Sequence, residues 1–530
     1  MNTKALRQKI LDLAIRGKLV PQDPNDEPAE VLLERIRKQK QQMLKEGKLK
    51  KKDIKNDTII FKGEDNLHYE KFQDGSVKCI EDEIPFELPE GWEWTRLQSI
   101  TSILTDGTHK TPTYSEDGYI FLSSKNVTSG KIDWSNIMYI PESLHQELYS
   151  RLAPKIGDIL LAKNGTTGVA AIVDRKEVFD IYVSLALIRV VENIIDPLYI
   201  LNVIGSSFAQ DYFSSSLKGI GVPNLHLEHI RNTLIPIPPR LEQARINSRT
   251  DMLLPLAGQI EENREELKRL VSFLKSKILE LAIRGKLVPQ DPNDEPASVL
   301  LERIRAEKEE LIKQGQIKRD KKESVIFKGE DNSYYLRTEL ETMEIADELP
   351  YEIPESWEWA RIGNVFQVNP RNKLDDLLEV SFIPMPLIDD GFSGKHTSEV
   401  RVWEKIKSGF THFTEGDIGI AKITPCFENR KSVVFRNLKN NYGAGTTELH
   451  VLRPYASSIL PEYVLAYVKS SMFIDKGKQE FTGAVGQQRI GKDYVENSYF
   501  PIPPLAEQKR IVEQISTVYK QLDLISNALR

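Results

Sequence analysis

The chain of 530 residues lacks the features that mark several common classes of protein. It has only two cysteines, Cys79 and Cys426, so neither a disulfide framework nor a cysteine metal site is expected. Its apolar runs are short and interrupted, which excludes a membrane-spanning helix, and its amphipathic start lacks the apolar core of a signal peptide. We therefore expect a cytoplasmic protein.

The chain also lacks the basic excess that is typical of proteins that bind duplex DNA by themselves. Its net charge is −6; residues 90–240 have 13 Lys or Arg against 16 Asp or Glu, and residues 355–504 have 18 of each. A domain that grips phosphates alone usually has more positive charge. If these segments bind DNA, either their charge is segregated onto one face or a partner supplies much of the grip.

Sequence motifs for catalysis are missing as well. The chain has no phosphate-binding loop, no His-Glu-x-x-His and no Cys-x-x-Cys. Its Pro-Pro pairs read IPPR and IPPL, not the Asn/Asp-Pro-Pro-aromatic motif of amino-methyltransferases. Glu507-Gln508-Lys509 has the Glu-x-Lys form found in nucleases, but its counterpart reads Glu242-Gln243-Ala244. We expect no catalytic residues and no metal site in this chain.

The most prominent feature that is present is an internal repeat. The string LAIRGKLVPQDPNDEPA occupies residues 13–29 and returns unchanged at 281–297, within a stretch in which 27 of 29 positions are identical. Further pairs follow at a similar offset: FKGEDN at 61 and 327, GDILLAK at 157 and GDIGIAK at 416, and IPIPPRLEQ at 235 and FPIPPLAEQ at 500. The chain is therefore two copies of a unit of about 265 residues.

Apolar residues spaced four and three apart predict long amphipathic helices. They are Leu267, Val271, Leu274, Ile278 and Leu281 in the middle of the chain, Ile511, Ile515, Val518, Leu522, Ile525 and Leu529 at its end, and Leu6, Ile10 and Leu13 at its start. The Pro-Pro pairs suit helix starts, and Gly17 and Gly285 suit helix stops. We expect Pro255 to kink or interrupt the central helix.

The alignment of the two copies predicts how these helices pair. Arg530 aligns near residue 264 and Met1 aligns with Arg269, so the C-terminus stops about where the N-terminus begins. This pattern predicts a pseudo-two-fold arrangement with circular-permutation-like termini, in which an antiparallel, coiled-coil pair of long helices acts as a spacer between two globules.

The fold class that follows is α+β, with two strand-rich domains. Short apolar runs of strand type, separated by turn signals such as Asn164-Gly165, fill the diverged parts of the repeat. The Lys- and Glu-rich segments 38–57 and 306–324 are most simply solvated helix ends or linkers. The predicted regions are 1–37 (helical), 38–87 (charged linker or insert), 88–239 (first domain), 240–305 (central helical), 306–352 (charged linker or insert), 353–503 (second domain) and 504–530 (C-terminal helix).

Both diverged domains have polar loops at corresponding places. Lys, Arg, Asn, Gln and Thr are side chains that contact base edges and phosphates, and glycine permits a close backbone approach, although such loops can also be ordinary turns. The candidate DNA-binding residues are Thr108, His109, Lys110, Ser124, Lys125, Asn126, Lys163, Asn164, Thr166 and Asn224 in the first domain. In the second they are Arg371, Lys422, Thr424, Arg430, Lys431, Thr446, Thr447, Gln487, Gln488 and Arg489.

Taken together, the repeat, the IPIPP-L-x-EQ helix start, the GDI-x-x-AK strand, the AKITPCFENRK–GAGTTELHVLRP run and the LAIRGKL string resemble the specificity subunits of type I restriction–modification enzymes. The resemblance implies two target-recognition domains, 88–239 and 353–503, which each read one half of a split DNA site. It also implies two docked modification subunits that carry S-adenosylmethionine and methylate adenine, and restriction subunits that use ATP and Mg and cleave DNA.

The resemblance suggests why one string is identical in both copies. Divergent domains would read different half-sites, whereas identical strings would contact two copies of the same modification subunit. The expected partner-binding residues are Arg16, Lys18, Asp23, Arg284, Lys286 and Asp291. The simpler explanation of the string is a recent duplication, and the competing function is a duplicated-domain scaffold or ligand-binding protein without DNA specificity.

Overall fold

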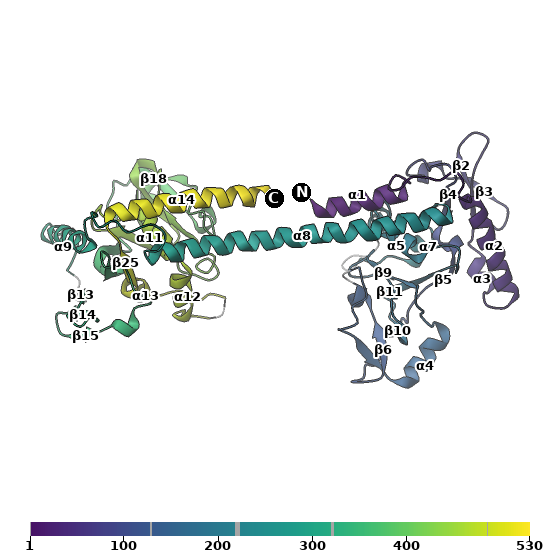
Figure 1. Cartoon of the computed structure of the whole chain (residues 1–530), viewed down its shortest axis with the longest axis horizontal. Helices are drawn as coiled ribbons and strands as arrows, with labels where there is room; N and C mark the ends of the chain where they lie inside the picture. Colours follow the sequence, from purple (N-terminus) through teal and green to yellow (C-terminus); the bar gives the residue numbers. More distant parts are fainter. Residues whose placement is uncertain (1, 128–129, 218–222, 320–322, 485, 530) are drawn as a thin grey trace. The chain divides into compact units, whose positions relative to one another are not determined.

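The computed structural model describes residues 2–127, 130–217, 223–319, 323–484 and 486–529, and contacts within it divide the chain into two compact units (Figure 1). The first unit is Met1–Asn263 and the second is Arg264–Arg530, in agreement with the sequence repeat. Each unit combines helices with small sheets around a strand-rich domain, which confirms the predicted α+β class. Among the described residues, no helix is both long and apolar enough to cross a lipid bilayer.

The first unit begins with a helical region. Its helices are α1 (Thr3–Ile15), α2 (Ala29–Lys45) and the short α3 (Lys51–Ile54). α1 stops where Gly17 adopts a φ of +63°. A Cβ atom on Gly17 would lie only 2.4 Å from the side chain of Pro89, so a larger residue fits neither the backbone nor the space. The repeated string therefore forms the end of α1 and an exposed loop before α2.

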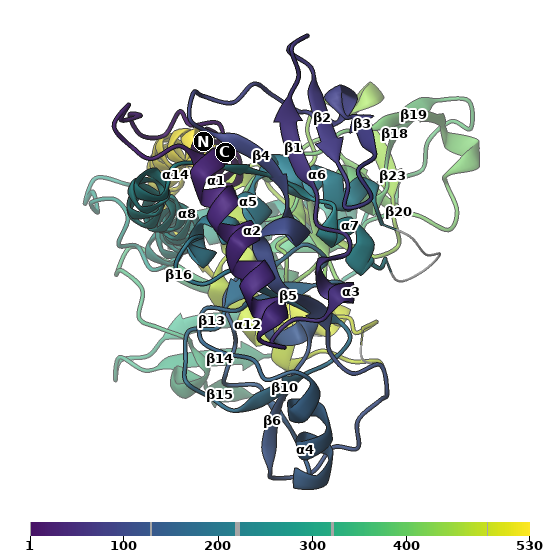
Figure 2. The same ribbon diagram turned by 90° about the vertical axis from the view of Figure 1, so that its right-hand side faces the viewer.

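Each unit then forms a small three-stranded antiparallel sheet. The strands are β1 (Ile59–Lys62), β2 (His68–Lys71) and β3 (Val77–Cys79) in the first unit, and β13 (Ser324–Lys328), β14 (Tyr334–Thr338) and β15 (Thr342–Glu344) in the second. In Figure 2, β1 to β3 lie side by side next to β4 (Glu93–Arg96). Residues 38–87 and 306–352 are thus more than the charged linkers that their composition suggested. The strands were missed because each has only three to five residues, of which at most two are buried.

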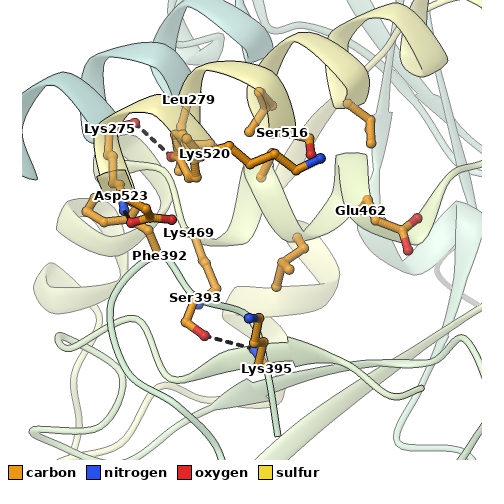
Figure 3. A pocket seen from close by; sticks show the side chains of 15 residues that line it. Lys275, Leu279, Phe392, Ser393, Lys395, Glu462, Lys469, Ser516, Lys520 and Asp523 are labelled. Carbon is orange, nitrogen blue, oxygen red and sulfur yellow. Dashed lines mark hydrogen bonds and ion pairs between the residues drawn. The ribbon is translucent and has the colours of Figure 1, made fainter. Parts of the chain in front are cut away.

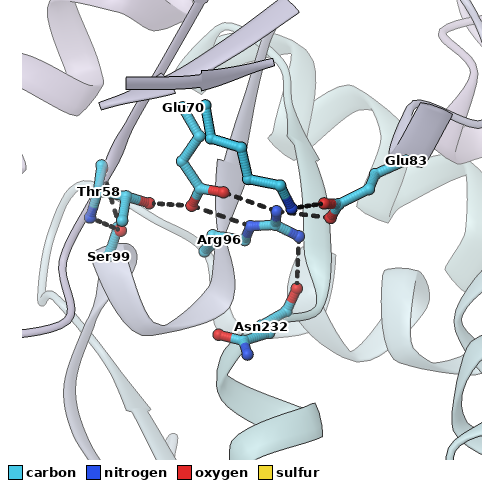
Figure 4. A network of polar contacts seen from close by, with 7 residues as sticks. Thr58, Glu70, Glu83, Arg96, Ser99 and Asn232 are labelled. Atoms are coloured by element: carbon cyan, nitrogen blue, oxygen red, sulfur yellow. Dashed lines mark hydrogen bonds and ion pairs between the residues drawn. The ribbon is translucent and has the colours of Figure 1, made fainter. Parts of the chain in front are cut away.

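A buried charge network attaches the first of these sheets to its domain (Figure 4). The guanidinium of Arg96 donates to Glu70 at 2.8 and 3.1 Å, to Glu83 at 2.7 Å and to the carbonyl of Asn232 at 2.9 Å. Thr58 donates a further hydrogen bond of 2.6 Å to Glu70. Because Arg96 and Glu70 are both buried, each ion depends on the other for compensation.

The second unit makes the corresponding attachment with apolar side chains. Leu336 aligns with Glu70, and it packs in a cluster with Ile326, Ile345, Trp359 and Tyr499. The two copies therefore keep the small sheet but hold it by different interactions.

The first domain is built on a four-stranded antiparallel sheet in the order β5-β11-β8-β9. Its strands are β5 (Thr101–Asp106), β8 (Ile159–Ala162), β9 (Ala170–Ile172) and β11 (Leu185–Val190). A second sheet, β10-β6-β7, has β6 (Tyr119–Leu122), β7 (Met138–Ile140) and β10 (Phe179–Ile181), and β4 pairs with β12 (Leu234–Ile237). The helices are α4 (Glu142–Arg151), α5 (Pro197–Gly205), α6 (Ser207–Ser215) and α7 (Leu227–Arg231).

Every residue of β8 is buried because both faces of the sheet are covered. Ile159 and Leu161 point into the core that contains α5, whereas Leu160 and Ala162 point into a second core on the opposite face. The residue that follows β8 therefore leaves the sheet from a rigid, fully packed strand.

The second domain has two four-stranded sheets. One has the order β17-β24-β21-β22, with β17 (Phe366–Val368), β21 (Ile418–Ala421), β22 (Ser432–Val434) and β24 (Leu449–Pro454). The other has the order β19-β18-β23-β20, with β18 (Glu379–Ile383), β19 (Glu399–Val402), β20 (Thr411–Thr414) and β23 (Tyr442–Gly445), and β16 (Glu358–Arg361) pairs with β25 (Tyr499–Ile502). The helices are α9 (Ala297–Lys313), α10 (Ile362–Val365), α11 (Pro461–Val468), α12 (Ser471–Gln479) and α13 (Lys492–Asn497).

Short 3-10 helices complete both units. They lie at Glu81–Glu83, Leu97–Ile100, Ser124–Val127, Ala346–Glu348, Met385–Leu387, Trp403–Lys405 and Lys439–Asn441.

The longest element is α8 (Arg240–Ile283), a helix of 44 residues that contains the boundary between the two units. In the first unit, α1 runs antiparallel to its first half, because Thr3 donates to Glu261 while Gln22, just after α1, reaches back to Glu242. In the second unit, α14 (Leu505–Ala528) runs antiparallel to its second half. There the hydroxyl of Tyr519 donates to the carbonyl of Lys275 at 2.9 Å.

Pro255 does not interrupt this helix, since α8 continues through it, so that part of the expectation is wrong, whereas a kink at Pro255 stays a prediction. Proline removes one backbone hydrogen bond, whose acceptor would be the carbonyl of Asp251. Both Pro255 and Asp251 are exposed, so water can bind the freed carbonyl.

The predicted apolar stripes are only partly buried. Val271, Ile511 and Leu522 are buried, whereas Leu267 and Leu274 are 44% and 45% exposed. A pair of helices covers one side of each helix only, so a regular apolar spacing does not bury every member.

Candidate nucleic-acid interface

The candidate recognition loops of the first domain leave the sheet at the ends of β5 and β8. β5 ends at Asp106, and β8 is followed at once by Lys163. The ammonium of Lys163 lies 2.5 Å from the carboxylate of Asp106, and both side chains are less than 10% exposed. Such a buried pair fixes both loops, because separating the charges would leave each one in an apolar environment.

Backbone hydrogen bonds fix the loop after β8 further. The N–H of Leu225 donates to the carbonyl of Lys163 at 2.9 Å, and the N–H of Gly168 donates to that of Ala162. Asn164 and Asn224 face each other in an isolated antiparallel bridge. Asn164 and Asn224, both predicted site residues, are thus neighbours although they lie 60 positions apart in sequence. Thr166 is exposed at the tip of the loop.

A polar cleft of about 520 Å³ opens at this place. Its lining brings together four predicted residues, His109, Lys163, Asn164 and Asn224, and adds Asp106, Val183, His226, Leu227 and Glu228. The side chain of His109 is 71% exposed and its Nε2 lies 3.3 Å from Asp106. The side-chain oxygen of Asn224 is buried without a hydrogen-bond partner among the described residues, so it is available to a donor that enters the cleft.

The remaining candidates of the first domain divide into exposed and internal side chains. Lys110 and Lys125 are exposed, and Ser124 is half-buried. Thr108 is buried beside β10, where its N–H donates to Ile181. The amide of Asn126 is buried and binds the carbonyls of Asp133 and Asn136, so it holds its own loop. Of the neighbouring GVPN loop, Gly221 and Val222 lie outside the described residues.

The second domain repeats this construction with different side chains. Lys422 follows β21 as Lys163 follows β8, and its carbonyl accepts from the N–H of Ile490 at 3.0 Å. Ile423 forms the isolated bridge with Arg489, where the first domain has Asn164 and Asn224. The hydroxyl of Thr424 is buried without a partner among the described residues. The backbone frame is therefore kept while the groups that it presents change.

Arg489 is held by a carboxylate. It makes two hydrogen bonds of 2.9 Å to Glu448, a planar pairing that orients the guanidinium, and the hydrogen bond from Arg489 lowers the pKa of Glu448. Thr447 and Gln487 are exposed near this pair, and Thr446 and Gln488 are half-buried. Lys422, Thr424 and Arg489 thus lie close together.

Three other candidates of the second domain make internal contacts. Arg371 donates to the carbonyl of Phe410, Arg430 donates to the carbonyl of Lys469, and Lys431 donates to the carbonyl of Ile388. In this conformation these cations hold loops together. Arg430 and Lys431 are half-buried, whereas Arg371 is exposed, and donor-rich composition did not distinguish the two kinds.

The repeated string has a second set of contacts that is duplicated between the units. Trp92 and Gln22 both donate to Glu242, at 3.0 and 3.4 Å. Trp357 and Gln290 both donate to Glu507, at 2.8 and 2.6 Å. Burial raises the pKa of Glu242 and of Glu507. The glutamate of the Glu-x-Lys pattern at Glu507 is therefore a structural acceptor.

Charged residues of the string are also bound within their own unit. Asp26 pairs with Arg245 at 2.5 Å, and Asp294 pairs with Arg510 at 2.6 Å. The guanidinium of Arg16 lies 4.2 Å from the ring centre of Phe86, and that of Arg284 lies 4.8 Å from the ring centre of Tyr351.

Two predicted partner-binding pairs remain at the surface. Asp23 and Asp291 are exposed and cap their own loop through Asn25 and Asn293. Lys18 and Lys286 are exposed. Much of the identity between the two strings is thus explained by contacts inside each unit. Lys18 and Lys286 are the predicted partner-binding residues that are most simply available to a partner at the surface.

Sequence reasoning missed Asp106, His226 and Glu228 as members of the cleft. Asp106 could have been found, since it lies two residues before the candidate Thr108, but a search for hydrogen-bond donors does not select a carboxylate. His226 and Glu228 are brought to the cleft by the start of α7, which no sequence pattern positioned.

A family model described as the type I restriction modification DNA specificity domain matches residues 89–269 and 354–530. The chain belongs to this family. Both matches begin just before the first strand of a domain and extend into the long helices, so the DNA specificity domain occurs once in each unit.

Relatives with this domain include two proteins of Escherichia coli. The chain is 47% identical over 254 residues to the EcoAI specificity subunit, covering 48% of this chain and 40% of that protein. It is 48% identical over 247 residues to the EcoEI specificity subunit, covering 46% of this chain and 39% of that protein. The aligned part thus spans less than half the length of these curated relatives.

Among solved structures, the HsdS subunit of Thermoanaerobacter tengcongensis aligns with a TM-score of 0.47 at 18% identity, over 84% of this chain and 93% of that one.

Proposed function

We propose that this chain is the DNA-recognition subunit of a type I restriction–modification system, in which each domain reads one half of a bipartite site. The observation that carries the proposal is the pair of matched loop frames after β8 and β21. They present Lys163, Asn164 and Asn224 in one domain. In the other they present Lys422 and Arg489. A constant frame with variable donors suits two readers of different sequences.

The proposal assigns the chemistry to other chains. This chain contributes recognition and no catalytic residue. Modification subunits would bind S-adenosylmethionine and methylate adenine, and restriction subunits would use ATP and Mg. The modification subunits would also supply much of the grip on the phosphates, which fits the lack of basic excess in both domains.

Two modification subunits would dock on each chain, one on each copy of the repeated string. The exposed Lys18 and Lys286 support this, because they occupy the same place in the two units and are not needed for the internal contacts of the string.

The test is a domain exchange followed by mapping of methylated adenines in host DNA. Replacing residues 88–239 by the matching domain of a relative is expected to change one half of the methylated motif only. The matched control exchanges residues 353–503 and is expected to change the other half. A change in both halves in either exchange would contradict the two-reader proposal, and so would methylation that does not depend on this chain.

A further inference from the structure

The second unit has a pocket of about 460 Å³ away from the recognition loops (Figure 3). It lies between α11 on one side and the helices α8 and α14 on the other. Its apolar lining consists mainly of Leu279, Leu465, Ala466, Val512 and Ile515, with Phe392 and Tyr519 near one end. A volume of this size is within the range of small-molecule sites, about 300–1,000 Å³.

Four lysines border this apolar surface, and among the described residues only Lys275 has a carboxylate within ion-pair distance. Lys275 is paired with Asp523 at 2.5 Å. Among the residues that the structure describes, Lys395 and Lys520 have no carboxylate within ion-pair distance.

The fourth lysine, Lys469, is 2% exposed. Its ammonium donates to the carbonyls of Gly391 and Arg430 at 2.6 and 2.9 Å, so it is held without a neutralising charge. The pocket lining contains two acidic residues, Asp523 and Glu462. Asp523 pairs with Lys275, and Glu462 is bound to Arg436 at 2.6 Å. The pocket therefore has an excess of positive charge.

The first unit provides an internal comparison, because the same helices occur there. Ala466, Val512 and Ile515 align with Asn202, Asn247 and Thr250. In the first unit these three polar side chains are buried and bonded to each other: Asn202 donates to Asn247 at 3.1 Å and to Thr250 at 3.0 Å. The position that is closed by polar contacts in one unit is thus open and apolar in the other.

Two of the four lysines are also specific to the second unit. Lys469 aligns with Gly205, and Lys520 aligns with Pro255. A Cβ atom on Gly205 would already lie 3.3 Å from Leu11, so the first unit has little room for a side chain there. The apolar lining, Lys469 and Lys520 therefore all differ between the two units, at positions on or beside otherwise corresponding helices.

We infer that this pocket binds a small organic anion with an apolar body. The body would lie on Ala466, Val512 and Ile515, and the anionic group would be bound by Lys395 and Lys520. An ammonium beside an apolar cavity binds an anion in the cavity more strongly than it binds a counter-ion in open solvent. The reason is that the charge-assisted hydrogen bond lies in a region with little water. Since the walls come from both the domain and the helix pair, an occupant would contact both.

The test is calorimetric titration of the full chain with decanoate, and separately with decanol as an uncharged analogue of the same length. Saturable binding of about one decanoate per chain is expected, with decanol at least about tenfold weaker. The double variant Lys395→Glu/Lys520→Glu is expected to lose decanoate affinity by at least about tenfold, because it reverses the two unpaired charges. Ala466→Phe is expected to abolish binding by filling the pocket.

The matched control is Lys509→Glu, an exposed lysine on the same helix α14 that does not line the pocket. It is expected to bind decanoate like the unaltered chain. Circular dichroism checks that each variant is folded, and the charge variants decide the matter if Ala466→Phe is not. Absence of decanoate binding, equal binding of decanol, or equal losses in the charge variants and the control would overturn the inference.

Discussion

At the scale of single residues, Lys163 has two roles that can be separated. It neutralises the buried Asp106, and it lines the cleft of the first domain. Removing its charge alone leaves the buried Asp106 with the 3.3 Å contact to the exposed His109 in place of the close ion pair, which costs more than the pair itself contributes.

We predict that Lys163→Met lowers the free energy of unfolding by about 3 kcal/mol, because the buried carboxylate of Asp106 loses its close ion pair and keeps only the longer contact with His109. Asp106→Asn/Lys163→Met is expected to regain most of that loss while DNA binding by the assembled enzyme stays weak. Urea denaturation gives the stability, and fluorescence anisotropy with a labelled duplex gives the binding. Recovery of DNA affinity in the double variant would show that Lys163 acts only through the stability of its loop.

Lys469 provides a prediction for pH. Burial lowers its pKa from 10.5 to about 7. In the unfolded chain the amine keeps its proton until about pH 10.5, so between pH 7 and 10.5 the unfolded state binds more protons than the folded state. The destabilising effect of the buried charge is complete below pH 7 and is relieved as the pH rises.

We therefore expect the stability of the unaltered chain, relative to Lys469→Met, to increase by a few kcal/mol between pH 7 and pH 10. Urea denaturation of both proteins at several pH values measures the difference, and the subtraction removes the contribution of other titrating groups. A difference that stays constant with pH would contradict the assignment of Lys469 as a buried, strained cation.

At the scale of elements, the small sheets show how one attachment can be made in two ways. Arg96 bridges Glu70 and Glu83 in the first unit, whereas Leu336 packs among apolar side chains in the second.

We predict that Arg96→Met costs about 3–5 kcal/mol of stability, because it leaves the buried Glu70 uncompensated. Adding Glu70→Leu, the residue that the second unit uses, is expected to restore part of this loss. Thermal unfolding followed by circular dichroism measures both variants. Glu90→Leu, at an exposed position, is a control for the general effect of adding a leucine. If it restored the stability of Arg96→Met as well as Glu70→Leu does, the proposed attachment through Arg96 and Glu70 would be contradicted.

The repeated string makes a separate prediction about assembly. Lys18→Glu/Lys286→Glu is expected to weaken binding of modification subunits more than either single change, with little effect on the stability of the free chain. Native mass spectrometry counts the bound subunits. Arg16→Glu/Arg284→Glu is a less suitable test, because these arginines stack on Phe86 and Tyr351 and their loss would disturb each unit. Undiminished assembly of the lysine variant would place the docking surface elsewhere.

Elements with strong periodicity or repeated motifs were predictable from the sequence, and the directions of side chains were not. The long helices and the two strand-rich domains follow from spacing and from the alignment of the two copies. The inward amide of Asn126, the internal pairing of Arg430 and the entry of His226 into the cleft depend on tertiary packing. Composition cannot reveal which face of a loop is solvated.

At the scale of the whole molecule, the proposed function gives α8 the role of a ruler. Seven residues inserted at about Lys268 keep the apolar stripe in phase and lengthen the helix by about 10 Å. We expect the methylated motif to keep both half-sites and to gain about three base pairs of unread sequence, since duplex DNA advances about 3.4 Å per base pair. Adenine methylation mapping measures the motif. An unchanged spacing in an active variant would show that α8 does not set it.

The division of α8 between two units also has a consequence for folding. Its first half is stabilised by α1 and its second half by α14, while Gln259, Glu262, Asn263 and Glu266 near the boundary are exposed. Backbone amides there have less tertiary protection than those within the two packed halves, so they should exchange with deuterium by local opening before the amides of those halves do. Helix formation is cooperative, however, because adding a residue to an existing helix is easier than starting a new one. Unfolding of one unit would therefore also destabilise the half of α8 that belongs to the other unit. The unfolding free energies of the two units should therefore be coupled, because the backbone hydrogen bonds of α8 continue from one unit into the other.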